Sequence, residues 1–218
     1  MGVRSHSHHR HEHSRPAWGE PRPTLAARLL RRGRELLGGT AAAEWPGLPE
    51  LPLALRRGEL AAAYLAAEQG GDHARAGAAA SRASEEAIAV EAWWPADAWA
   101  HRALWHFERA ELGLQATRQA RRIGDLRVAA GDPGSARRYY AEAIDEARDL
   151  GAEHEQGLAA LGLGRAHLDL GEVTLGRRLA SAAADLLERA GAPRTEIDAA
   201  KALQGIEQAV GERTEEVD

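Results

Sequence analysis

The hydrophobic positions of this chain recur with the spacing of amphipathic helices, and glycines end the helical stretches at regular distances. The stretch 114–130 contains no proline, and Gly131 follows it, as glycine commonly does just after a helix. Pro133 then stands at a first-turn position, where its missing N–H costs nothing. The pattern predicts a second helix to about Leu150, where Gly151 ends it.

This helix pair repeats with a period of 40 residues. The recurring doublets are Gly131-Asp132, Gly171-Glu172 and Gly211-Glu212, and between them Leu150-Gly151 and Ala190-Gly191. A fixed period of this size indicates a helical repeat, because one helix pair buries its apolar face only against another. The sequence predicts an all-α fold: an α-solenoid of antiparallel helix pairs, with about nine helices and a disordered N-terminal arm.

The repeats resemble the tetratricopeptide repeat family, in a variant of about 40 residues. The residues that carry the resemblance are Ile123, Gly124, Arg127, Gly131, Ala136, Tyr140 and Ala143 in one unit, and Leu163, Gly164, His167, Gly171, Gly176 and Ala183 in the next. The resemblance implies close helix packing at the small residues, with Tyr140 filling the seam. It also implies a concave surface, lined by the first helix of each pair, that holds a segment of a partner protein. HEAT-like helix pairs have a similar period and are the structural alternative.

Changes in composition divide the chain into five parts. Residues 1–23 are a predicted disordered His-rich arm, and residues 24–52 are a basic amphipathic helix with a proline-rich linker. Residues 53–113 are a predicted irregular helical part with a tryptophan cluster. The tetratricopeptide-like repeats follow at 114–211, and residues 212–218 form an acidic tail.

In the irregular part we expect one helix over 53–69 and a second capped by Asp72. A third is expected to begin after Trp94-Pro95, with Asp97 as its cap. Because Gly71 lies 60 residues before Gly131, an extra helix is expected to break the 40-residue period. The last helix is expected over 196–210.

The basic amphipathic helix is predicted over 25–37, with Thr24 as its N-cap. Its leucines share one face, and its arginines cover the rest. The helix either packs on the N-terminal end of the repeats or binds an anionic membrane or a partner.

Composition narrows the function classes. The 218 residues include no cysteine, which excludes disulfides and thiolate chemistry, and a single lysine among 28 basic residues is typical of a GC-rich bacterial genome. We expect no membrane span and no signal peptide, and hence a cytoplasmic protein. Residues 1–58 hold ten arginines and five acids (+5), and the remaining residues carry −10 of the net −5. The acidic body argues against nucleic acid as a partner.

Mapping the tetratricopeptide pattern onto the repeats implies a groove for a protein or peptide partner. Its predicted residues are Arg118, Arg121, Arg122, Asp125, Leu158, Leu161, Arg165, Asp169 and Lys201. Arginine binds carboxylates in a bidentate manner, so an acidic segment is plausible. The alternative is that these arginines only answer acids of their own surface.

The arm carries five histidines within eight positions: His6, His8, His9, His11 and His13. Imidazole ligates nickel and zinc, so the arm is a candidate metal site for Ni or Zn, or else a solvated tail. The alternative function is therefore a metal-handling accessory protein that docks a client metalloenzyme.

No catalytic motif occurs in the sequence, and we expect a scaffold or adaptor rather than an enzyme. Four tryptophans and a phenylalanine gather near residue 100: Trp93, Trp94, Trp99, Trp105 and Phe107. They predict either a bulky core or, as a third function, the pocket of a small-molecule sensor.

Overall fold

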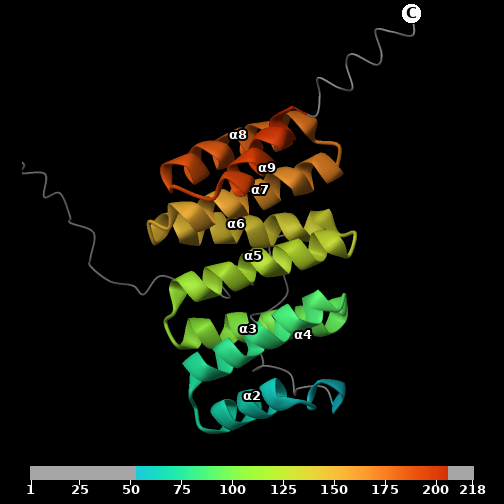
Figure 1. Cartoon of the computed structure of the whole chain (residues 1–218), viewed down its shortest axis with the longest axis vertical. Helices are drawn as coiled ribbons and strands as arrows, with labels where there is room; N and C mark the ends of the chain where they lie inside the picture. The colour runs from blue at the N-terminus through green and yellow to red at the C-terminus, as the bar shows by residue number, and fades with distance from the viewer. Residues whose placement is uncertain (1–52, 206–218) are drawn as a thin grey trace, which may run out of the picture.

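The computed structural model describes residues 53–205, and this part of the chain is helical throughout (Figure 1). A 3-10 helix, η1 (Leu53–Leu55), precedes eight α-helices. They are α2 (Glu59–Gln69), α3 (His73–Ala89), α4 (Trp93–Arg109), α5 (Gly113–Ala129), α6 (Pro133–Asp149), α7 (Glu153–Asp169), α8 (Val173–Arg189) and α9 (Arg194–Gln204). Because residues 53–205 contain no strand, the predicted all-α class is confirmed.

The helices from α3 to α8 each contain 17 residues and start 20 residues apart. The turns before and after them each hold one residue with φ between 56° and 76°: Gly71, Glu91, Glu111, Gly131, Gly151, Gly171 and Gly191. The next N–H bonds a carbonyl five residues back, as Asp132 N does with Arg127 O at 2.8 Å. Glycine adopts this left-handed conformation without strain, which explains why glycines mark most of the turns.

Small residues allow the helices to pack closely. At 20-residue steps, the buried positions are Ala80, Ala100, Ala120, Tyr140, Ala160, Ala180 and Ala200. Larger side chains lie against glycine: a Cβ added at Gly77 would lie 2.8 Å from Phe107, and one at Gly157 would lie 2.8 Å from Leu187. These two contacts join α3 to α4 and α7 to α8.

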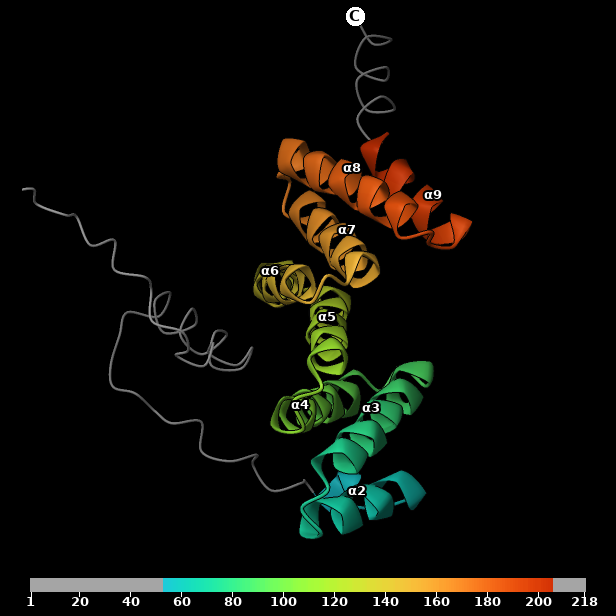
Figure 2. The ribbon, with the colours of Figure 1, turned by 90° about the vertical axis from the view of Figure 1, so that its left-hand side faces the viewer.

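The helices pack in chain order as antiparallel pairs, α3 with α4, α5 with α6 and α7 with α8. In the side view, α3, α5, α7 and α9 form one layer and α4, α6 and α8 the other (Figure 2). Contacts between α5 and α7 and between α7 and α9 make the first layer continuous there. This layer is the one on which the groove was predicted.

Three helix boundaries differ from the prediction. The helix expected from residue 53 begins at Glu59, because Gly58 takes a φ of 97° before it. The fourth helix begins at Trp93 instead of after Asp97, because Pro95 lies in its first turn, where no N–H is needed. The last helix starts at Arg194 rather than at residue 196.

The expected break in the repeat is also wrong. α3 and α4 have the same length and spacing as the later helices, so the 60 residues between Gly71 and Gly131 are three helix steps. α3 is therefore the first helix of a pair, like α5 and α7, and is not equivalent to α6. The two kinds of helix look alike in sequence because both bury alanine at the same position, as Ala76 and Ala136 show.

Candidate partner-binding groove

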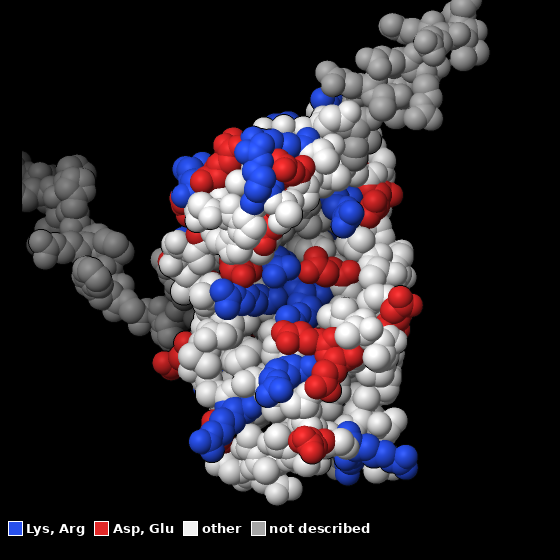
Figure 3. Space-filling model, viewed as in Figure 1, with Lys and Arg blue, Asp and Glu red and all other residues white. Residues whose placement is uncertain are grey.

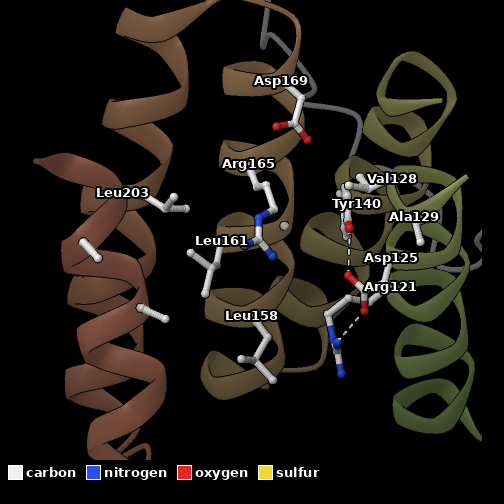
Figure 4. A pocket seen from close by; sticks show the side chains of 13 residues that line it. Arg121, Asp125, Val128, Ala129, Tyr140, Leu158, Leu161, Arg165, Asp169 and Leu203 are labelled. Atoms are coloured by element: carbon white, nitrogen blue, oxygen red, sulfur yellow. Dashed lines mark hydrogen bonds and ion pairs between the residues drawn. The ribbon is translucent and has the colours of Figure 1, made fainter. Parts of the chain in front are cut away.

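A groove with a volume of about 640 Å³ runs between α5, α7 and α9 on the first layer (Figure 4). Its lining residues are Arg121, Asp125, Val128, Ala129, Tyr140, Leu158, Leu161, Gly162, Arg165, Asp169, Ala199, Ala202 and Leu203. Six of the nine residues predicted from the sequence are among them. The structure thus brings Arg121, Asp125, Leu158, Leu161, Arg165 and Asp169 together.

Apolar side chains line much of the groove. Leu158 and Leu161 come from successive turns of α7, and Leu203 faces them from α9 (Figure 4). Val128 and Ala129 contribute from the last turn of α5. This surface can bury the apolar side chain of a partner segment.

The α5 wall carries a small hydrogen-bonded group. The Tyr140 hydroxyl donates to Asp125 Oδ1 at 2.7 Å, and Arg121 Nη1 donates to Asp125 Oδ2 at 3.1 Å. Burial raises the pKa of Asp125, although half of its side chain faces the groove, and the positive charge of Arg121 opposes the rise. Burial and the neighbouring Asp125 carboxylate raise the pKa of Tyr140. The tyrosine therefore stays a hydrogen-bond donor.

Two of the predicted arginines are bound by a buried acid. Glu155, whose side chain is 6% exposed, accepts from Arg118 Nε at 2.9 Å and from Arg121 Nε at 3.2 Å. This pair of bonds ties α7 to α5 across the first layer. The sequence prediction missed Glu155, which lies 37 and 34 residues from its two partners.

Arg122 is likewise held within the protein and does not line the groove. Its guanidinium donates to Glu85 Oε1 at 2.7 Å and to Ser81 Oγ at 3.1 Å, both on α3. Basic side chains nevertheless gather at the centre of this face, between acidic ones above and below (Figure 3). The geometry of Arg118, Arg121 and Arg122 matches the alternative in which the arginines answer acids of their own surface.

Arg165 differs from these three arginines. It lines the groove from α7 and makes no hydrogen bond or ion pair with any residue of 53–205. In the close view its guanidinium lies between Leu161 and the Tyr140–Asp125 pair (Figure 4). Asp169, one turn further along α7, also lines the groove and makes no such bond within the described residues.

The other predicted site residues lie elsewhere. Lys201 is on α9 but pairs with Glu188 of α8 and does not line the groove. The five histidines of the arm lie outside the described residues. Within 53–205 no group of three or more His, Asp or Glu side chains is arranged to hold a metal ion.

The tryptophan cluster is divided between core and surface. Trp99 and Phe107 are buried, and Trp99 packs edge-on against Tyr64 with ring centroids 5.2 Å apart. Trp93 and Trp94, at the start of α4, are 41% and 59% exposed. The residues predicted to form one pocket therefore do not all converge.

Several lining residues were absent from the predicted site. Val128 and Ala129 follow Asp125 on α5, and Leu203 had been noted only as a repeat marker. Tyr140 and Gly162 were identified as packing residues, yet both reach the groove. Tyr140 would overlap a Cβ at Gly162, so the absence of a side chain there leaves room for the ring.

A scan against models of known protein families finds no match for the chain. A search of curated proteins finds no similar sequence either. None of the helices within 53–205 has both the length and the apolar character needed to cross a bilayer. What the comparisons leave to argue from is therefore the geometry of the helical repeat and its groove.

Proposed function

We propose that this protein is an interaction scaffold, and that its repeats are of the tetratricopeptide kind. The groove between α5, α7 and α9 receives one segment of a partner protein, with a binding role rather than a catalytic one. The segment carries a carboxylate that pairs with Arg165 and an apolar side chain that packs on Leu158 and Leu161.

The observation that carries this proposal is the unpaired Arg165 beside an apolar surface. The other arginines of this wall, Arg118 and Arg121, already have a carboxylate partner in Glu155. Arg165 has none among the described residues, so a ligand carboxylate can take both of its guanidinium N–H pairs. Such a charged hydrogen bond contributes roughly 1.5–3 kcal/mol to binding.

The internal bonds of the wall support the same role in a different way. Because Glu155 and Asp125 fix Arg121, and Asp125 fixes Tyr140, the groove is ordered before a partner arrives. A preformed surface avoids the entropy cost of ordering side chains on binding. The charge of Asp169 disfavours a second acid one turn beyond Arg165 and favours a basic or neutral residue there.

An unbiased selection tests the proposal. Random displayed peptides are selected on the full chain, and the enriched peptides are retested on Leu161→Asp and on Arg178→Glu. Arg178 is an exposed arginine of α8, in the other layer, and serves as the matched surface control. We expect enriched peptides to combine an acid with an apolar residue, to lose binding to Leu161→Asp and to keep binding to Arg178→Glu. Peptides that bind both variants as well as the wild type would contradict the proposal.

A further inference from the structure

A second groove lies at the N-terminal end of the repeats, between α2 and α3, with a volume of about 600 Å³. Its lining residues are Leu60, Ala63, Ala66, Ala67 and Gly70 from α2 and its C-cap, and Asp72, Arg75, Ala78, Ala79 and Arg82 from α3 and its N-cap. α2 itself has no charged residue between Glu59 and Glu68, and it buries only Ala61 and Tyr64. A helix that is apolar on nearly all sides is normally covered on nearly all sides.

The repeat shows what covers these α2 positions elsewhere. Steps of 40 residues take Leu60, Ala63 and Ala67 to Ala100, Ala103 and Phe107 of α4, to Tyr140, Ala143 and Ala147 of α6, and to Ala180, Ala183 and Leu187 of α8. All nine equivalents are buried. In α4 and α8 the covering element is the first helix of the same pair, because Phe107 lies on Gly77 of α3 and Leu187 lies on Gly157 of α7.

The α3 wall of this groove leads to the same conclusion. Forty residues on, Ala79 and Arg82 correspond to Gln119 and Arg122 of α5. Both of these side chains reach back to Ser81, on the first helix of the preceding pair. The groove between α2 and α3 is therefore the place where the first helix of one more pair would lie, with α2 as its second helix.

We propose that residues 25–37 of the same chain occupy this groove as that first helix. The segment precedes α2 in the chain, and its sequence predicts a helix with leucines on one face and arginines on the other. Alone, a helix of this length is marginal in water, so it needs a surface to pack on. The position one regular step before α2 is interrupted by Pro46 and Pro49, which shifts the helix towards the N-terminus.

Reach and charge agree with this placement. Residues 38–52 span up to about 50 Å when extended, which is enough to return the segment to α2 in an antiparallel orientation. Residues 1–58 carry a net charge of +5 and the rest of the chain −10, so the arm is attracted to the body.

Crosslinking in the full chain tests the proposal, because the protein has no cysteine of its own. Ala66→Cys is combined either with Leu29→Cys on the apolar face of the segment or with Arg31→Cys on the opposite face. A short bismaleimide should link the Leu29 pair within one chain about tenfold faster than the Arg31 pair, because docking raises the effective concentration of one face only. Equal rates for both faces would overturn the proposal, and so would dimeric products that depend on protein concentration.

A second measurement does not depend on introduced cysteines. In full-length Leu29→Asp, amide hydrogen exchange should become faster in α2 and α3 and stay unchanged in α7 and α8. The control Arg31→Asp should leave both regions as in the wild type. Unchanged exchange in α2 of Leu29→Asp would also overturn the docking of residues 25–37.

Discussion

The Tyr140 hydroxyl bonds Asp125 Oδ1 at 2.7 Å, and this bond connects the packing of the helix pair to the wall of the groove. Tyr140 starts on α6, in the second layer, and its ring lies against Gly124 of α5 and Gly162 of α7. The hydroxyl thereby reaches the first layer. One side chain thus joins three helices, and changes in its packing should alter the groove as well as the stability.

Gly162→Ala should lower the free energy of unfolding. The added methyl group would overlap the Tyr140 ring, so α7 or the ring must move, at a cost of about 1–3 kcal/mol. Gly134→Ala, also inside a helix, is the control, because a Cβ there meets only Asp132 Oδ1 at 3.6 Å. Urea unfolding of both variants measures the difference. A Gly162→Ala protein as stable as Gly134→Ala would show that the ring does not fill this space.

Glu155→Gln should destabilise the protein more than an exposed ion pair would suggest. The buried carboxylate binds Arg118 and Arg121, and its loss leaves two guanidinium groups without their acid. We expect a loss of about 1–3 kcal/mol in the free energy of unfolding. The control Glu188→Gln removes the exposed partner of Lys201 and should change it by less than about 0.5 kcal/mol. Equal effects in denaturant titrations would argue against a structural role for Glu155.

Glu111→Gly should stabilise the protein. Glu111 holds a φ of 57° at a turn where most other repeats have glycine. Relief of this strain outweighs the added flexibility of glycine in the unfolded chain, with a net gain of about 0.5–1 kcal/mol. The reverse change, Gly131→Ala at a φ of 76°, should cost about 1 kcal/mol. Thermal unfolding of the two variants should therefore shift the melting temperature in opposite directions.

Acid should weaken the N-terminal helices through a buried histidine. His106 Nδ1 lies 3.0 Å from Nδ1 of His73, and its Nε2 lies 3.2 Å from the Tyr64 hydroxyl, which donates to Glu68 at 2.6 Å. Since the hydroxyl proton goes to Glu68, His106 must donate from Nε2 and accept at Nδ1 from His73. A proton on Nδ1 would break this arrangement.

Burial, with the nearby charges of His73, Arg102 and Arg109, lowers the pKa of His106 from 6.5 to about 4. The unfolded chain therefore binds the proton more tightly, and stability falls as the pH drops from about 6.5 towards 4, by on the order of 3 kcal/mol in all. Urea midpoints at pH 7.5 and pH 5 measure this loss. His106→Gln should lose less between the two values than the wild type. An equal loss would assign the acid sensitivity to other groups.

The repeat was readable from the sequence because its turns require a left-handed residue. Gly131, Gly151 and Gly171 mark such turns, and their spacing predicted the helix pairs correctly. Where Glu91 and Glu111 take the same conformation, the marker disappears. The prediction consequently lost the repeat near α4 and placed a break where the structure has none.

The groove was predictable in outline only. Helical periodicity shows which residues share a face, so Arg121, Leu161 and Arg165 were correctly placed together. Periodicity does not show which acids the neighbouring helices supply. The pairing of Arg118 with Glu155 depends on how two helices are set against each other 37 residues apart, and this follows from tertiary packing.

The most direct test of the account inverts the charge at Arg165. Two peptides are compared that differ in a single position beside a leucine, aspartate in one and lysine in the other. The wild type and Arg178→Glu should bind the aspartate peptide more tightly, by roughly ten- to hundredfold, as expected for one charged hydrogen-bonded pair. Arg165→Glu should prefer the lysine peptide. If calorimetric titration gives the same preference for all three proteins, the groove between α5, α7 and α9 is not the surface that recognises the partner.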